Sequence, residues 1–355
     1  MAQRIVSARQ SDERVTMGLG TFGDLTRDSH GDLLPYGAVI RNIVDQAVHA
    51  ESVGVDAFGI GEHHRDDFAV SAPEIVLAAI AARTERITLG TATTVLTTDD
   101  PIRLYERFAT LAGISRGRGE MILGRGAFTE SFPLFGVDLA DYDVLSAEKT
   151  ELIRHLQTEG PITWSGTHRP PLRGQEVFPK TEAGLVPAWI GVGGSPQSVI
   201  RAAQGGFPVA LALLGVGAER LAPLADLYRR ALEQFGRPRM PLAVHAPGFV
   251  AATDEEAIDL LWPHVRDYTG RIASERGGPA PTRDCFEAEV RHGAYHVGSP
   301  DTVAKKIVHT LATLDAQRFD LKYAHGAMPH EALMETIGLY GAEVIPRVHR
   351  LRASS

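Results

Sequence analysis

Short runs of β-branched and apolar residues alternate along the chain with longer segments whose apolar positions recur at helical spacing. The short runs predict eight strands, at residues 15–19, 57–60, 87–89, 120–123, 188–192, 208–213, 242–250 and 319–323. The longer segments predict helices, among them 39–52, 73–83, 102–112, 147–158, 196–204, 218–235 and 300–314. This alternation is typical of βαβ units and a parallel sheet. Eight units without a break in composition favour a closed (β/α)8 TIM barrel, an α/β fold, over an open sheet.

Two segments interrupt the alternation. Residues 160–187 are rich in proline and glycine and follow the helix after the fourth strand. Residues 253–296 carry helical patterns broken by Gly277-Gly278-Pro279 and lie between the seventh and eighth strands, where they predict extra helices or a lid. Neither resembles an independent domain, so we predict one barrel domain over residues 1–355. Because long insertions in barrels usually lie at the active-site end, we expect both to shape the substrate cavity.

Composition narrows the class of partner. The 355 residues are 44% hydrophobic, enough for a large core, and the net charge of −8 argues against a nucleic acid or an anionic membrane surface. Cys285 is the only cysteine, which excludes an intramolecular disulfide and a multi-cysteine metal site. Residues 1–10 lack the apolar core of a signal peptide. We therefore predict a soluble cytoplasmic protein with a small-molecule substrate.

A glycine pattern near the first strand resembles a dinucleotide-binding motif. Gly18-Leu-Gly20-Thr-Phe-Gly23 matches G-x-G-x-x-G, but that motif requires a helix to begin at the glycines. The next residues, 24–31, have the composition of a loop. The pattern favours a turn of close backbone approach at the mouth of the barrel.

Glu62, His63 and His64 follow the second predicted strand. In barrels, functional residues collect at the C-terminal ends of strands, although a purely structural histidine is a second interpretation. Neighbouring side chains on extended backbone point to opposite sides, so the three cannot all face one point. We expect His63 to point into the cavity, and Glu62 and His64 to hold the loop.

Small residues follow the third and fourth strands. The segment Gly90-Thr-Ala-Thr-Thr-Val-Leu96 leaves room for a flat ligand, although an extended β-branched strand explains it equally well. Arg125 lies between Gly124 and Gly126, which allow the backbone to approach a ligand closely. We expect Arg125 to project its charge into the barrel mouth, where it suits a phosphate or a carbonyl-bearing ring.

The most informative motif spans residues 189–198, Trp-Ile-Gly-Val-Gly-Gly-Ser-Pro-Gln-Ser, where the fifth strand meets a helix. Pro196 suits the first turn of the helix, and Ser195 suits the N-cap. The free amides and the dipole of a helix N-terminus form an anion site. Gly193 and Gly194 remove the Cβ atoms that would obstruct a phosphate. A helix that is only capped is the structural alternative.

In order and spacing, these motifs resemble those of the bacterial luciferase-like family of flavin-dependent monooxygenases. The resemblance extends over about residues 15–348 and is most specific in residues 56–64, 87–111, 118–137 and 187–210. It implies a (β/α)8 barrel that binds reduced FMN supplied by a separate reductase. The family is commonly dimeric through its second and third helices, so a homodimer is expected.

The resemblance also assigns roles to individual residues. His63 matches the family's active-site histidine, and the Ala92-Thr93 bond matches a non-prolyl cis peptide that lies beneath the flavin ring. Arg125 matches an arginine that binds the phosphate end of FMN. The phosphate turn after the fifth strand corresponds to Val192, Gly193, Gly194, Ser195 and Ser198.

Two departures separate the chain from the luciferases proper. Those proteins have a glutamate where this chain has Gly194 and a reactive cysteine where it has Gly124. Light emission is therefore not expected, whereas phosphate binding through amides needs neither side chain.

The implied reaction uses reduced FMN and O2 and proceeds through a C4a-(hydro)peroxyflavin, which transfers one oxygen atom to a small organic substrate. His63 is the candidate for proton transfer, since the unperturbed pKa of histidine lies near neutral. In the variable segments, Tyr295 and His296 are candidate substrate contacts.

Other functions are compatible with parts of this pattern. A dehydrogenase that uses the deazaflavin F420 would share the fold and transfer hydride. A reductase that oxidises NADH itself and a non-catalytic flavin-binding protein would also share it. A metal-dependent hydrolase built on His63, His245 and His325 is a rival from another class, although the His-x-His pair usual at its first strand is missing.

Overall fold

The computed structural model describes residues 14–126, 128–158, 160–182 and 184–354. Eight parallel strands form a closed ring, because each pairs with the next and the last pairs with the first. In ring order they are β1 (Thr16–Thr21), β2 (Ala57–Ile60), β3 (Thr88–Thr91), β5 (Gly119–Gly124), β8 (Ala188–Val192), β9 (Val209–Ala212), β10 (Leu242–Val250) and β12 (Arg318–Lys322). The predicted α/β barrel and its eight strands are confirmed.

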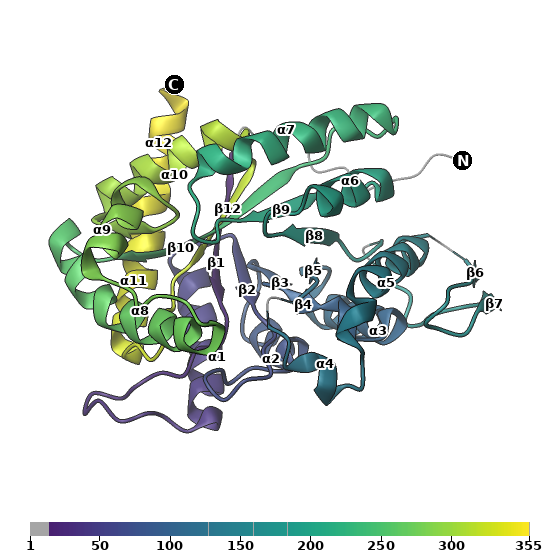
Figure 1. Ribbon diagram of the computed structural model, residues 1–355, viewed down its shortest axis with the longest axis horizontal. Coiled ribbons are helices and arrows are strands. Elements are labelled where there is room, and N and C mark those ends of the chain that lie inside the picture. Colours follow the sequence, from purple (N-terminus) through teal and green to yellow (C-terminus); the bar gives the residue numbers. More distant parts are fainter. Residues whose placement is uncertain (1–13, 127, 159, 183, 355) are drawn as a thin grey trace.

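Helices surround this ring (Figure 1). The predicted ones are α1 (Tyr36–Ser52), α2 (Pro73–Ala81), α3 (Pro101–Ser115), α5 (Tyr142–Leu156), α6 (Pro196–Gly205), α7 (Ala218–Gln234) and α10 (Pro300–Leu314). Local chemistry fixes several starts: Asp100, Ser195 and Ser299 accept first-turn amides of α3, α6 and α10, each followed by proline. The chain ends in helices that were not predicted, α11 (His330–Leu339), a π-helical turn (Tyr340–Val344) and α12 (Ile345–Ala353).

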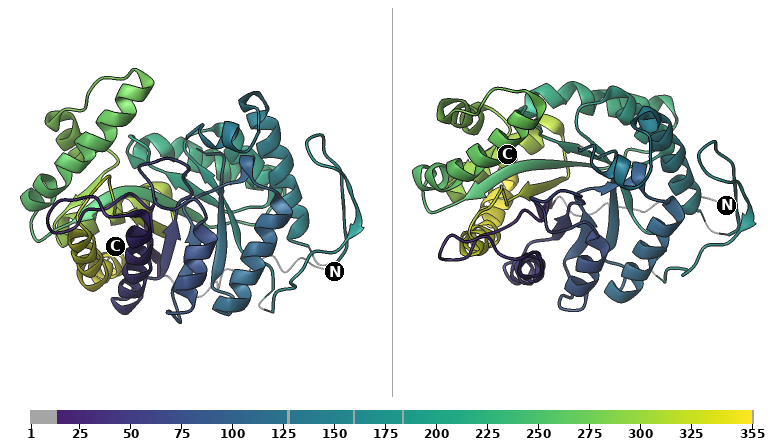
Figure 2. Two further views of the ribbon diagram at one scale, coloured as in Figure 1. Left: turned by 90° about the horizontal axis from the view of Figure 1, so that it is seen from below. Right: turned by 60° about the horizontal axis from the view of Figure 1, so that its bottom comes forward.

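The two insertions project from opposite sides of the barrel (Figures 1 and 2). Residues 160–187 contain an antiparallel hairpin of β6 (Ile162–Trp164) and β7 (Leu172–Gln175). Residues 253–296 contain α8 (Asp254–Arg276) and α9 (Arg283–His292), and β11 (His296–Gly298) then extends the sheet beside β10. Smaller elements are β4 (Thr94–Val95), α4 (Ser131–Leu134) and 3-10 turns at Leu96–Thr98 and Leu139–Asp141.

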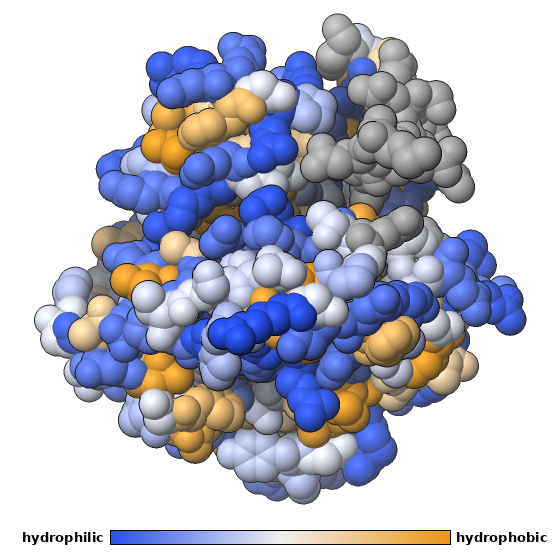
Figure 3. All heavy atoms as spheres, turned by 90° about the vertical axis from the view of Figure 1, so that its right-hand side faces the viewer, coloured by the Kyte–Doolittle hydropathy of each residue, from blue (hydrophilic) through white to orange (hydrophobic). Residues whose placement is uncertain are grey.

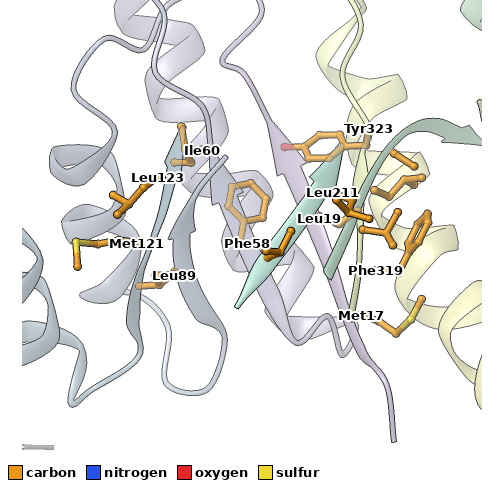
Figure 4. Close-up of a cluster of buried hydrophobic side chains, with 14 of the residues drawn as sticks. Met17, Leu19, Phe58, Ile60, Leu89, Met121, Leu123, Leu211, Phe319 and Tyr323 are labelled. Carbon is orange, nitrogen blue, oxygen red and sulfur yellow. The ribbon is translucent and has the colours of Figure 1, made fainter. Parts of the chain in front are cut away.

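Alternate residues of the barrel strands face the helices. These positions carry large apolar side chains, which form the main core between the ring and the helices (Figure 4). Met17, Phe58, Leu89, Phe319 and Leu321 all have exposed fractions of zero. Because side chains alternate across a strand, the intervening residues must face the interior of the barrel.

Many of those inward positions are small or charged, and a separate apolar cluster of Ile122, Ala210 and Ala243 with Trp189 lies among them. A Cβ atom at Gly18 would overlap the carboxylate of Asp320, and one at Gly59 would lie 3.1 Å from the Ala92 Cβ. The guanidinium of Arg318 donates to Glu120 at 2.5 Å and to Asp320 at 2.9 and 3.0 Å. All three charged side chains are buried, so the barrel floor is an ionic network rather than a layer of aliphatic side chains.

The outer surface is mixed in character. On the face that Figure 3 shows, hydrophobic side chains gather in separate small groups between hydrophilic ones. Within the described parts of the chain, no helix has the length and apolarity that a membrane span requires.

Removing the central cation of the floor should be costly. Arg318→Met removes the buried cation that two buried carboxylates share, and we expect the free energy of unfolding to fall by about 3–5 kcal/mol at pH 7.5. Burial would raise the pKa of Asp320, but Arg318 and His245 together outweigh burial and lower that pKa from the ordinary 3.8. This stabilisation is present above the unfolded-state pKa and lost at lower pH.

Without Arg318 the carboxylates take up protons more readily, so the deficit of Arg318→Met should be smaller at pH 5 than at pH 7.5. Urea unfolding at both pH values measures this. Arg239→Met, which removes an exposed ion pair with Asp315, is the control and should cost about 1 kcal/mol or less. A pH-independent deficit below 1 kcal/mol in Arg318→Met would contradict the account.

Candidate active site

A cavity of about 940 Å³ opens above the ionic floor. Its lining residues come from the carboxyl ends of the barrel strands and from the loops that follow them. Every residue predicted to be catalytic or to bind the cofactor borders it: His63, Ala92, Thr93, Arg125, Val192, Gly193, Gly194, Ser195 and Ser198. The chain thus brings together residues that are widely separated in sequence, as barrel topology requires.

The Ala92-Thr93 peptide bond is cis, as the resemblance implied. The Thr93 side chain packs against two glycines of neighbouring strands. A Cβ atom at Gly124 would overlap the Thr93 hydroxyl, and one at Gly191 would lie 2.9 Å from the Thr93 Cγ2. Gly124, where the luciferases proper carry cysteine, is therefore the residue that leaves room for Thr93.

The turn between β8 and α6 has the features of an anion site. Ser195 is the N-cap of α6, and its Oγ accepts the Ser198 N–H at 3.3 Å. That amide is therefore not free, which corrects the expectation that it points unpaired at a ligand. Gly194 has a φ of 137° and its missing Cβ would meet nothing within 4 Å, so the approach to the turn is open.

Two arginines, Arg125 and Arg201, lie beside this turn. The Arg125 guanidinium lies 4.8 Å from the centre of the Tyr142 ring and 2.7 Å from the exposed carboxylate of Asp143. Arg201, three residues after Ser198 on α6, donates to the Ser198 Oγ at 3.5 Å. Both arginines and Ser198 line one small pocket beside the main cavity. Sequence reasoning missed Arg201, although helical spacing from Ser198 could have revealed it.

The loop after β2 is held as expected. Glu62 accepts the Val95 N–H at 2.9 Å through one oxygen and contacts the Nε2 of His64 at 3.0 Å through the other. The His63 ring instead stacks on Phe68 at 4.2 Å and meets Phe22 at 4.9 Å. His63 is thus part of an aromatic wall of the cavity.

Burial changes the proton chemistry expected of His63. Desolvation, together with the charge of Lys322, lowers its pKa to about 3. At neutral pH the ring is therefore an uncharged imidazole, able to offer one N–H and one acceptor. The near-neutral pKa expected from the sequence is therefore wrong for His63.

A second histidine lies at the base of the cavity. The Nε2 of His245 is 2.7 Å from an oxygen of Asp320, and Asp320 is in turn held by Arg318. His245 and Asp320 both line the cavity. His245 lies beside Asp320 at the base of the cavity, whereas the His63 ring is uncharged among aromatic side chains. His245 is therefore a better placed proton carrier than His63.

The insertion between β10 and β12 covers the cavity, whereas the other insertion does not reach it. Tyr268, Ile272 and Tyr295 line the cavity, but none of residues 160–182 and 184–187 does. The expectation that both insertions shape the cavity is wrong for the first. His296 is also not a cavity residue, because its ring is buried between the Ala294 carbonyl and the Thr310 hydroxyl.

The histidines proposed for a metal site do not form one. His63 and His325 line the cavity from the loops after β2 and β12, and His245 lines it from β10. In the described residues no group of three or more His, Cys, Asp or Glu side chains could hold a metal ion. His325 instead contacts the Lys322 carbonyl at 3.0 Å.

The floor residues were missed, although the sequence carried a signal for them. In Arg318-Phe-Asp-Leu-Lys-Tyr323, charged and apolar residues alternate strictly. A charge at every second position of a strand that is buried on both faces indicates charges inside the barrel. The many glycines on neighbouring strands leave the space that these side chains fill.

Comparison with known proteins identifies the family. The model of the family described as luciferase-like monooxygenase matches residues 12–317. The chain belongs to the luciferase-like monooxygenase family. Over 229 residues it is 27% identical to the alkanal monooxygenase alpha chain of Photorhabdus luminescens, a match that covers 62% of this chain and 61% of that protein.

Solved structures share the fold. One is the oxygenating constituent of 3,6-diketocamphane monooxygenase from Pseudomonas putida in complex with FMN, with a TM-score of 0.76, 21% identity, and coverage of 94% of this chain and 98% of that one. Another is an F420-dependent secondary alcohol dehydrogenase in complex with an F420-acetone adduct, with a TM-score of 0.72, 16% identity, and coverage of 94% and 99%. Neighbours of this fold thus bind either cofactor.

The packing around the cis bond of this luciferase-like protein can be tested by filling the space at Gly124. Gly124→Ala should destabilise the fold by about 1–3 kcal/mol, because the new methyl group overlaps the Thr93 hydroxyl. The double variant Gly124→Ala/Thr93→Ala should recover part of the loss, measured by urea unfolding in a double-mutant cycle.

Gly113→Ala is the matched control, since Gly113 lies in α3 with nothing within 4 Å of its missing Cβ. That variant should be neutral or slightly stabilising. A Gly124→Ala protein as stable as the wild type would show that Thr93 does not occupy this space.

Proposed function

We propose that this protein is a monooxygenase that uses reduced FMN and O2 to oxidise a small organic substrate. When bound, the flavin supplies the two electrons that split O2, so that one oxygen atom enters the substrate and the other leaves as water. The observation that carries the proposal is the convergence of three features on one cavity: the cis Ala92-Thr93 bond, Arg125 and the capped turn of α6.

The residues of the cavity fit the parts of FMN. The phosphate would bind the first turn of α6 and the turn at Gly194 and Ser195, with Arg125 and Arg201 supplying positive charge. The ring would lie against Ala92-Thr93, where the small side chains of β1 and β2 leave space. Helix α8 and its neighbours would exclude water from this part of the cavity.

Two histidines would serve different purposes. Neutral His63 would contribute a hydrogen bond and part of an aromatic wall. His245, oriented by Asp320, would hold and return the proton that the reaction needs. We propose that the protein acts as a cytoplasmic homodimer and receives reduced FMN from a separate reductase.

A hydride-transferring enzyme that uses F420 is the second candidate. The shared fold of the F420-dependent secondary alcohol dehydrogenase favours it. Binding measurements can distinguish the two cofactors, because named residues should provide most of the affinity for the FMN phosphate.

We expect the protein to bind FMN at least tenfold more tightly than riboflavin, measured by quenching of flavin fluorescence. Arg125→Met should weaken FMN binding about tenfold or more, the loss of a charge-assisted hydrogen bond of about 1.5–3 kcal/mol. The same change should leave riboflavin binding unaltered, because riboflavin has no phosphate.

Arg220→Met, which removes an exposed arginine of α7, is the control and should bind both flavins as the wild type does. Equal affinity for FMN and riboflavin would contradict the phosphate assignment. Tight binding of F420 in a protein that does not bind FMN would favour the second candidate.

A further inference from the structure

Besides Arg125 near the phosphate turn, the cavity has a second cation, Lys322, on the opposite wall. Lys322 ends β12, and β5 is the fourth strand from β12 in either direction around the ring. In an eight-stranded barrel this separation is diametric, so Lys322 and Arg125 mark opposite sides. The proposed roles of FMN leave Lys322 without a function.

The ammonium group of Lys322 is incompletely bonded by the protein. It donates to the Ala324 carbonyl and forms an ion pair with Asp24, whose nearest oxygen lies 3.6 Å away, too far for a hydrogen bond. An ammonium group has three donors, and Ala324 is the only hydrogen-bond acceptor found for it among the described residues. The rings of Phe22 and Tyr268 lie 4.6 and 5.9 Å from the nitrogen. The group is thus a desolvated cation with capacity for another acceptor.

Two phenols supply further donors on the same part of the lining. Tyr268 comes from α8 and Tyr295 from the segment before β11, and both border the cavity with Lys322. No hydrogen bond of either hydroxyl is found among the described residues. Burial raises the pKa of Tyr295 to about 12 and that of Tyr268 further, so both remain protonated donors.

The surrounding wall is aromatic. Phe22, His63 and Phe128 line the cavity, with the rings of Phe22 and His63 at 4.9 Å and those of His63 and Phe128 at 5.4 Å. The carboxylate that pairs with Lys322, Asp24, is not part of the lining, and its Oδ1 accepts the Gly326 N–H. Glu289 is the lining carboxylate whose charge acts on Tyr295. The Lys322 ammonium group and the two phenols are the donors of this part of the cavity, and they lie beside aromatic faces.

We propose that Lys322, Tyr268 and Tyr295 bind an oxyanion carried by a flat, largely apolar substrate, such as a carboxylate, phenolate or enolate attached to a ring. A desolvated ammonium group favours an anionic oxygen over a neutral one, and the aromatic wall favours a planar body. This inference rests on the proposed function, because it names the substrate class of the same cavity.

The test uses calorimetric titration of the whole protein, without flavin, with three probes. These are 2-naphthoate, its neutral carboxamide and acetate. We expect 2-naphthoate to bind at least tenfold more tightly than the carboxamide, and acetate to bind far more weakly than either aromatic probe. Lys322→Met should abolish the preference for the anion, and Tyr268→Phe should reduce it several-fold.

Two controls assign the preference to Lys322. Arg125→Met removes the cation at the other end of the cavity and should leave the preference intact. Lys305→Met removes an exposed lysine of α10 that pairs with Asp301, and should also leave it intact. Thermal unfolding verifies that each variant is folded. If Lys322→Met is unfolded, the binding of the three probes to the wild type, Arg125→Met and Tyr268→Phe still tests the inference.

Equal binding of the anion and the carboxamide by the wild type would overturn the inference. A preference that disappears in Arg125→Met would also overturn it. So would a preference that persists in folded Lys322→Met, or one that is unchanged in Tyr268→Phe. Because no flavin is present, the titration remains informative even if FMN does not bind, so failure of this inference and failure of the proposed function are distinguishable.

Discussion

Arg318 joins Glu120 and Asp320 inside the barrel, and this buried ion pair network takes the place that aliphatic side chains fill in most barrels of this type. The network needs space, which glycines such as Gly18 and Gly90 provide on the neighbouring strands. It also holds His245 through Asp320 at the base of the cavity. The alternation of charged side chains and glycines on these strands therefore closes the floor and leaves the upper barrel hollow. It also places His245 beside Asp320.

Above the floor, the cavity is asymmetric. One wall carries the α6 N-terminus, Arg125 and Arg201, whose positive charge suits a phosphate. The opposite wall carries Lys322 beside aromatic side chains. The cis Ala92-Thr93 bond belongs to the same lining. A flavin anchored at the first wall would leave the second for a substrate, which relates the proposed cofactor and the proposed substrate class through one geometry.

Much of this arrangement could be predicted from sequence. Eight apolar runs and the helical segments between them predicted the barrel, because each buries a face that local pattern reveals. The residues after the strands, such as His63 and Arg125, were found because barrel topology gathers strand ends. Lys322 and the partners of His245 were not found, since their roles depend on neighbours across the ring. The depressed pKa of His63 likewise depends on burial, which its own segment does not show.

The central claim is that one cavity binds the phosphate of FMN at the α6 turn and the ring at the cis bond. A crystal structure of the protein with FMN tests it most directly. We expect phosphate density within hydrogen-bond distance of Ser195 and Arg125, and a flavin ring in contact with Ala92-Thr93. Flavin bound with its phosphate on the Lys322 wall, or outside the barrel mouth, would contradict it.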